Sequence, residues 1–255
     1  MLQSCLRLSL VLTLALLGQW VHAAGVEAIN IAGQQRMLSQ RIVKSWCQIG
    51  LNVQPTLSKR QLDEAVRRFE DNLKTLDAAT GSPEARSAMT GLRAAWSPLR
   101  TMALGVIRQS DAALIDGRGD DVLMAAERLT RTLQDQSNTP ISRWVNLAGR
   151  QRMLSQRLVK IYMLRQWGVD NSRLRDELES VQNEFSGALA SMQQRADNSP
   201  AARSEIDNLG LQWEWLRTAL ATEGADSFRL ILAEGGDEVL ELADQVTRIY
   251  EQSPP

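Results

Sequence analysis

The sequence contains very little histidine or cysteine. Its 255 residues include a single histidine, His22, and two cysteines, Cys5 and Cys47. Histidine general-base catalysis, Ser/His or Cys/His nucleophilic pairs and His/Cys metal sites all need more of these side chains than the chain supplies. We therefore expect a protein that is not an enzyme and that uses neither a metal ion nor an organic cofactor.

Long hydrophobic runs are also scarce. One apolar run, Leu8 to Leu17, follows Arg7 and precedes two small residues, Ala23 and Ala24. At about ten residues it is shorter than the roughly 20 that a membrane-spanning helix requires. This arrangement is typical of a secretory signal peptide, to which we assign residues 1–24. We expect the mature protein to be periplasmic and soluble, with no transmembrane segment.

Excess charge is missing as well. The chain has 29 basic and 30 acidic side chains, a net charge of −1 at pH 7. A nucleic-acid or anionic-membrane partner is therefore not indicated. Removal of residues 1–24 would leave Cys47 as the only thiol, which we expect to be a small buried apolar residue or an intermolecular link.

The sequence does contain an internal repeat. Residues 29–44 and 145–160 align at an offset of 145 − 29 = 116 and are identical at twelve of sixteen positions. The shared pattern is Asn-x-Ala-Gly-x-Gln-Arg-Met-Leu-Ser-Gln-Arg-x-Val-Lys. Downstream, Phe69 and Trp96 of the first copy match Phe185 and Trp213 of the second. The chain after residue 24 is therefore a duplication, which we divide into modules 25–138 and 139–255.

The sequence pattern of each copy predicts four helices. Glycine- and proline-containing breakers include 81–83, 116–119 and 137–140 in the first copy and 198–200 and 234–236 in the second. They leave helical stretches in copy one near 26–49, 59–79, 84–110 and 120–136. The alternation typical of strands is absent. We predict an all-α fold of two tandem antiparallel four-helix bundle modules, for which an end-to-end arrangement is one possibility.

The repeated helix has two faces that both avoid solvent. One apolar stripe consists of Ile31, Leu38, Ile42, Trp46 and Ile49. The opposite side mixes small, apolar and polar residues: Ile29, Ala32, Gly33, Arg36, Gln40, Val43 and Cys47, with Val145, Ala148, Gly149, Arg152, Gln156, Val159 and Met163 in copy two. A solvated face would have more charge and no glycine. We expect this helix to pack on both sides, with the Ala-Gly pair admitting another backbone closely.

Arg36 and Arg152 lie on that second face, where a partly dehydrated guanidinium needs an anionic partner. The partner is either an acidic side chain of a neighbouring helix or a bound planar oxyanion, which suits the fork of donors. We expect interhelical or surface hydrogen bonds from Gln40, Gln156, Arg41 and Arg157. We expect core or packing roles, rather than a ligand cage, for Trp46, Trp96, Trp213 and Trp215.

The motif Ala-Gly-x-x-Arg-Met-x-Ser-x-Arg, at 32–41 and 148–157, resembles the signature helix of the nitrate/nitrite-sensor and type IV pili chemotaxis-transducer N-terminal domains, the PilJ-like family. Those are periplasmic four-helix sensor domains. In nitrate-sensing members, the motif helices of two subunits meet at a dimer axis, where the motif arginine and backbone near the glycine hold one nitrate. The resemblance therefore implies Gly33, Arg36, Gly149 and Arg152 as ligand-binding residues.

This resemblance implies a sensory module that binds a small oxyanion, with nitrate and nitrite as the leading candidates. The module would then relay its ligand-bound state to a membrane-bound signalling protein. The two modules can mimic the dimer within one chain, with Arg36 and Arg152 on either side of one anion, or each motif helix can pair in a homodimer. The alternative is a non-catalytic structural or interaction protein of the cell envelope. In that case the second helix face docks a partner's helix and the arginines form ordinary ion pairs.

Overall fold

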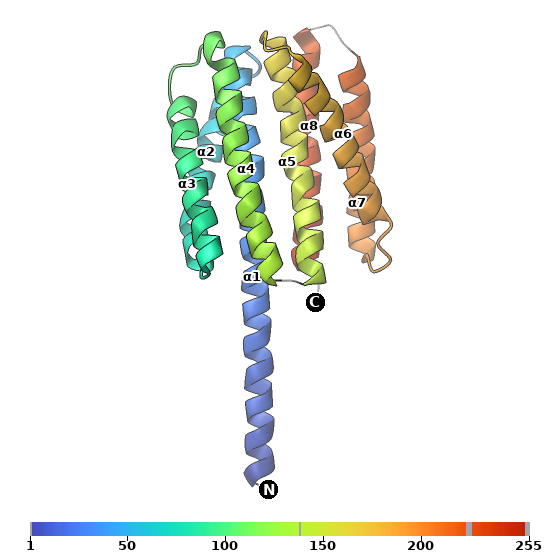
Figure 1. Cartoon of the computed structure of the whole chain (residues 1–255). Helices are drawn as coiled ribbons and strands as arrows, with labels where there is room; N and C mark the ends of the chain where they lie inside the picture. The colour runs from blue at the N-terminus through green and yellow to red at the C-terminus, as the bar shows by residue number, and fades with distance from the viewer. Residues whose placement is uncertain (1, 138, 223–225, 253–255) are drawn as a thin grey trace.

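The computed structural model of the chain consists of helices and short connections throughout its described part (Figure 1). It describes the backbone of residues 2–137, 139–222 and 226–252, and the side chains of 25–137, 139–222 and 228–252. The helices are α1 (Leu2–Gly50), α2 (Pro55–Ala79), α3 (Pro83–Ala103), the 3-10 helix η1 (Gln109–Asp111), α4 (Ala112–Ser137), α5 (Pro140–Gln166), α6 (Ser172–Gln193), α7 (Pro200–Ala221) and α8 (Asp226–Glu251). No strand occurs among these residues, so the prediction of an all-α fold is confirmed.

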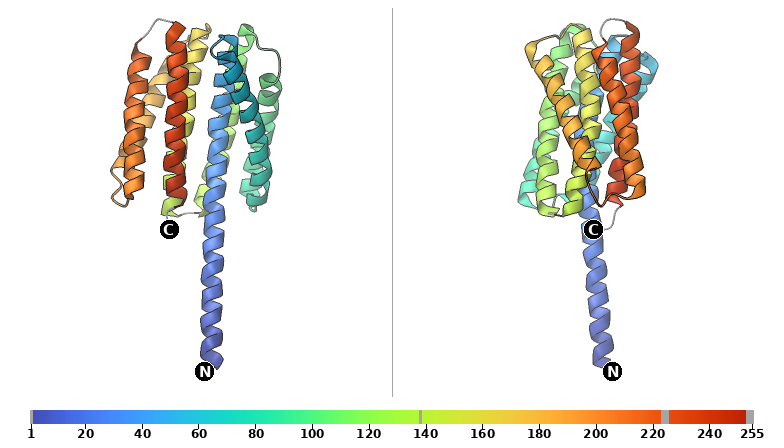
Figure 2. Two further views of the ribbon diagram at one scale, coloured as in Figure 1. Left: turned by 180° about the vertical axis from the view of Figure 1, so that it is seen from behind. Right: turned by 90° about the vertical axis from the view of Figure 1, so that its right-hand side faces the viewer.

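The two copies form two four-helix modules, α1–α4 and α5–α8, which lie side by side (Figures 1 and 2). The motif helix α1 packs against α2 and α4 of its own module and against α5 of the other. The second motif helix, α5, packs likewise against α6, α8 and α1. An end-to-end arrangement is therefore wrong, because burial of the second face of each motif helix requires the modules to meet along their length.

The N-terminal part of α1 projects beyond the other helices (Figure 2). It includes the predicted signal peptide, residues 1–24, whose side chains lie outside the described residues. Its cleavage stays a prediction. No helix among the described residues is both long enough and apolar enough to cross a membrane.

Three of the later helices begin at a proline that follows a capping side chain. Ser82, Thr139 and Ser199 each accept a hydrogen bond from a backbone N–H of the first helical turn, and proline occupies the first position of α3, α5 and α7. These caps satisfy donors that a helix start leaves unpaired, and proline supplies a backbone angle that already fits the helix. The breakers before these three helices were therefore correctly predicted.

Two predicted breakers are wrong. Residues 116–119 lie inside α4 and residues 234–236 lie inside α8. A Cβ atom added at Gly119 would lie 2.6 Å from Cγ2 of Val43 on α1, and one at Gly236 would collide with Val159 on α5. These glycines permit close helix packing rather than a turn. The predicted helix near 84–110 also ends earlier, at Ala103.

The module cores repeat in detail. Phe69 stacks on Trp96 with ring centroids 4.0 Å apart, and Phe185 stacks on Trp213 at 3.9 Å. Trp46 is buried as well. Trp215 is 47% exposed on α7, but its ring packs against Gly235 of α8, so all four tryptophans have core or packing roles, as predicted. Cys47 is a free, buried thiol, as one of the two alternatives predicted.

Candidate functional site

The candidate site lies where the second faces of α1 and α5 meet. Arg36 of α1 is 0% exposed and Arg152 of α5 is 1% exposed. Both motif glycines, Gly33 and Gly149, are buried beside them. The prediction that each motif helix packs on two sides is confirmed by this burial. The structure thus brings the four predicted site residues into one interface.

The Arg36 side chain joins the two modules. Its Nη1 donates to Glu127 of α4 at 2.6 Å, within its own module. Its Nη2 donates to the amide oxygen of Asn146 on α5, also at 2.6 Å. One edge of the guanidinium therefore faces a carboxylate, and another donor crosses to the opposite motif helix.

Arg152 repeats this arrangement from the other side. Its Nη1 donates to Asp244 of α8 at 2.7 Å, and its Nη2 donates to Asn30 of α1 at 2.7 Å. The offsets between matching residues are 152 − 36 = 116 for the arginines and 244 − 127 = 117 for the carboxylates. The interface therefore has an internal pseudo-twofold symmetry, and each arginine has the acidic neighbour that one of the two alternatives predicted.

The motif glycines make room for the guanidinium groups. A Cβ atom at Gly33 would lie 3.1 Å from Nη2 of Arg36 and 3.8 Å from Nη2 of Arg152. A Cβ atom at Gly149 would lie 2.9 Å from Nη2 of Arg152. Both arginines therefore reach the same small volume, which any larger side chain at these positions would obstruct.

Charge in this interface is dehydrated and closely balanced. Burial lowers the pKa of Arg36; Glu127 opposes this effect, while Arg150 and Arg152 add to it. Burial alone would raise the pKa of Glu127, but Arg36 and, to a smaller extent, Arg150 bring it down to about 2. With Arg131, which also donates to Glu127, three guanidinium groups thus stabilise the charged form of one carboxylate.

The Nε donors of the two motif arginines lack a good hydrogen-bond acceptor. Nε of Arg36 is buried and has no hydrogen-bond acceptor among the described residues. Nε of Arg152 reaches only the backbone oxygen of Gly149, at the long distance of 3.5 Å. A buried N–H without an acceptor costs about 1–3 kcal/mol. An acceptor that entered this interface would therefore find donors to bind.

A second pair of charges links the modules two turns further along the motif helices. The buried Nζ of Lys44 lies 2.6 Å from Asp237 of α8. The buried Nζ of Lys160 lies 2.7 Å from Asp116 and 3.0 Å from Asp120, both on α4. Each lysine therefore pairs with the opposite module, whereas each arginine pairs its Nη1 within its own.

The glutamines and outer arginines of the motif bond between helices, as predicted. Gln40 and Gln156 donate to the backbone oxygens of Gly119 and Gly236. Arg41 contacts Asp237 at 3.5 Å, and Arg157 contacts Glu177 at 2.7 Å. Arg41 and Arg157 remain partly exposed, whereas Arg36 and Arg152 are buried.

Sequence reasoning missed several residues of this interface. Asn30 and Asn146 accept from the arginines across the axis, and Lys44 and Lys160 pair across it. The available signal was their identity in both copies of the motif. Glu127 and Asp244 were harder to find, because they lie outside the motif and only the fold brings α4 and α8 to it.

The family model for the type IV pili methyl-accepting chemotaxis transducer N-terminal domain, PilJ, matches the chain over residues 20–122 and 135–234. The two segments cover most of the chain. This protein belongs to the PilJ family. The PilJ match occurs twice because the chain is duplicated, and each PilJ segment contains one motif helix with its arginine. Comparisons with curated proteins and with solved structures gave no match.

Proposed function

We propose that this protein is a periplasmic sensory module that binds one small planar oxyanion, nitrate or nitrite first, between α1 and α5. The ligand-binding residues are Gly33, Arg36, Gly149 and Arg152. PilJ membership supports a sensory role. The tandem motif helices supply within one chain the pair of arginines that the nitrate-sensing domains it resembles obtain from two subunits.

The observation that best supports the proposal is the meeting of two buried guanidinium groups at one glycine notch, with the Nε donor of Arg36 left without an acceptor. Planar oxyanions accept hydrogen bonds in the plane of a guanidinium fork, which gives them an advantage over spherical anions. The nearly complete burial of both arginines favours a small anion over a large one.

The anion has to replace existing partners. Glu127 and Asp244 are charged and hold their arginines strongly, so displacement of either would cost more than it returns. The amide oxygens of Asn30 and Asn146 are neutral acceptors of the same Nη2 donors. We infer that the anion replaces these two amides at Nη2, which would couple ligand binding to the contact between the modules.

We propose that the state of this interface is relayed to a membrane-bound signalling protein. A ligand at the α1–α5 interface touches both modules at once and can change how they pack. The membrane partner would detect that change from outside the bundle. Docking of a partner helix on the second face of α1 is disfavoured, because α5 of the same chain occupies that face.

Thermal unfolding of the chain without residues 1–24 tests the proposal. The protein is melted with nitrate, nitrite, chloride, sulfate and short carboxylates at constant ionic strength. Ligand at about 100 times Kd stabilises the native state by roughly 2.7 kcal/mol, which raises Tm by several degrees. We expect a shift that is selective for a planar anion.

Arg36→Lys and Arg152→Lys keep the charge but lose the fork, so each should fold and lose most of the anion response. The control is Arg93→Lys, since Arg93 pairs with Asp77 on the exposed surface of α2 and α3. An unchanged response in both motif variants, or no response of the wild type to any anion, would refute the oxyanion site and leave the arginines as structural ion pairs.

A further inference from the structure

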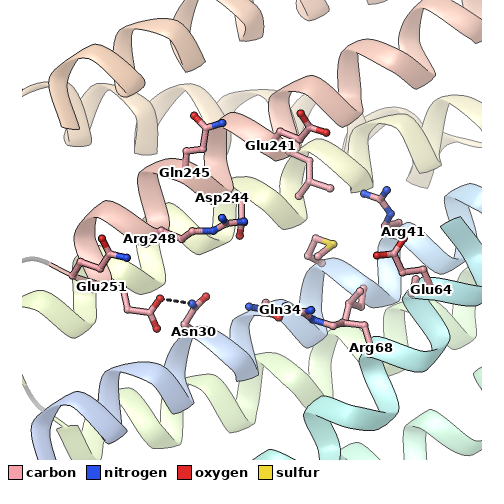
Figure 3. A pocket seen from close by; sticks show the side chains of 15 residues that line it. Asn30, Gln34, Arg41, Glu64, Arg68, Glu241, Asp244, Gln245, Arg248 and Glu251 are labelled. Carbon is pink, nitrogen blue, oxygen red and sulfur yellow. Dashed lines mark hydrogen bonds and ion pairs between the residues drawn. The ribbon is translucent and has the colours of Figure 1, made fainter. Parts of the chain in front are cut away.

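The two sides of the α1–α5 interface differ despite the internal symmetry. On one side, a cleft of about 690 Å³ opens between α1, α2 and α8 (Figure 3). Its lining includes Asn30, Gln34, Arg41, Arg68, Glu241 and Arg248. Asn30 and Asp244, the two side-chain partners of Arg152, both line it, so the cleft borders the candidate anion site without containing its arginines.

The symmetry-related position contains an ion-pair network instead. There, Nη1 of Arg150 on α5 lies 2.9 Å from Glu127 on α4, and its Nε pairs with Glu184 on α6. This network connects three helices across the space that corresponds to the cleft. The residue that matches Arg150 is Gln34 (150 − 34 = 116), and the one that matches Glu184 is Arg68 (184 − 68 = 116).

These two exchanges remove the connection on the cleft side. Gln34 is too short and has no charge to bridge α2 and α8, and Arg68 would repel rather than attract a cation at position 34. Ala65 also stands where the other module has the larger Val181 (181 − 65 = 116). The cleft therefore arises from specific side-chain differences between the copies.

Of the seven charged side chains that line the cleft, four have partners and three do not. Arg248 pairs with Asp244, and Asn30 donates to Glu251 at 2.8 Å. Arg68 and Glu64 of α2 and Glu241 of α8 form no ion pair with another described residue, and Arg68 and Glu241 come from opposite walls of the cleft (Figure 3). A cation on one wall and a carboxylate on the other suit a ligand with both charges.

We propose that this cleft binds a small zwitterion of the amino-acid type. Arg68 and the amide of Gln34 donate to the ligand carboxylate, and Glu241 accepts from its ammonium group. Charge-assisted hydrogen bonds at both ends distinguish such a ligand from a simple anion, which Glu241 would repel. The volume of the cleft also lies within the range of small-molecule sites.

Isothermal titration calorimetry of the purified chain with each of the twenty common L-amino acids tests this proposal. Acetate and methylammonium serve as probes with one charge each. We expect millimolar or tighter binding of at least one amino acid, and binding at least tenfold weaker for each single-charge probe. No amino-acid binding at 10 mM ligand, or acetate binding of equal strength, would overturn the proposal.

A double variant, Gln34→Arg with Arg68→Glu, recreates the Arg150–Glu184 pair on the cleft side, with Asp244 in the place of Glu127. We expect it to fold with a Tm at or above that of the wild type and to lose amino-acid affinity at least tenfold. Arg67→Glu makes the same charge reversal as Arg68→Glu, one residue away on the exposed side of α2, and should retain binding. Undiminished affinity in the double variant would place the binding elsewhere.

The same variants distinguish this site from the oxyanion site. Neither Gln34 nor Arg68 contacts Arg36 or Arg152 through a hydrogen bond or ion pair among the described residues. A selective nitrate response that persists in the double variant therefore leaves the proposed function intact whatever happens to amino-acid binding. The loss of both responses without loss of fold in the single variant Arg68→Glu, which adds no competitor for Asp244, would show one shared site and overturn the assignment of a separate one.

Discussion

At the residue scale, buried charges in this protein are compensated pair by pair across helices. Arg36 and Arg152 have one carboxylate each, and Lys160 has two within 3.0 Å. Lys44 has Asp237 as its nearest carboxylate, and burial lowers the pKa of Lys44 to about 8 despite that partner. Equivalent positions of the two copies therefore differ in how far their neighbours offset the cost of burial.

The pairing of Glu127 predicts a pH dependence of stability. Its pKa is about 2 in the folded protein against 4.5 ordinarily, so its contribution is fully present above pH 4.5 and is lost as pH falls through 2. Glu127→Gln should lose on the order of 3 kcal/mol of unfolding free energy at pH 7 and should show a flatter decline between pH 4.5 and 2. Urea unfolding at several pH values measures both effects.

The control for that experiment is Glu179→Gln, which changes an exposed glutamate of α6. It should follow the wild-type pH profile within error. If the unfolding free energy of Glu127→Gln declines as steeply as that of the wild type below pH 4.5, the ion pair with Arg36 does not lower the pKa of Glu127.

At the element scale, the two motif helices determine the architecture because they are buried on two sides. Sequence periodicity was sufficient to predict eight helices in two repeats, and the glycine and arginine on the second face of each motif helix correctly indicated close packing there. It was not sufficient for α4 and α8, where Gly117, Gly119, Gly235 and Gly236 resemble turn residues. A glycine that admits a neighbouring helix and a glycine that ends a helix look alike until the neighbour is known.

Substitution of Gly119 tests whether this glycine allows α4 to pack closely against α1. Glycine to alanine inside a helix normally stabilises it by up to about 1 kcal/mol. At Gly119 the new Cβ would lie 2.6 Å from Cγ2 of the β-branched Val43, so Gly119→Ala should instead destabilise the protein by roughly 1–3 kcal/mol. Chemical unfolding at pH 7 gives the difference.

Two further variants make the measurement specific. Gly91→Ala places a Cβ in α3 with no other atom within 4 Å and should be neutral or stabilising. Val43→Ala should recover part of the loss caused by Gly119→Ala in the double variant, because it removes the colliding methyl group. Stabilisation by Gly119→Ala alone would mean that α4 does not approach α1 as closely as described.

At the scale of the whole molecule, the modules share a boundary that neither can leave exposed. Separation would hydrate the apolar faces of α1 and α5 and would break the paired contacts of Arg36, Arg152, Lys44 and Lys160 across or beside the interface. This is why Asn30 and Asn146, the partners of the buried arginines, could not be assigned from one copy alone: their roles exist only between the modules.

We therefore expect the chain to unfold in one cooperative transition rather than module by module. Differential scanning calorimetry should give a single peak whose calorimetric and van't Hoff enthalpies agree. Two resolved transitions, or a calorimetric enthalpy about twice the van't Hoff value, would indicate that the modules unfold independently.

The presence of both motif helices in one polypeptide changes the concentration dependence of the interface. Two separate subunits must find each other at cellular concentrations, whereas linked modules meet at an effective concentration that is commonly in the millimolar range. The α1–α5 pair therefore forms in every molecule, however few copies the cell makes. Occupancy of a ligand site between these helices then reports the concentration of the ligand alone, with no contribution from the amount of sensor.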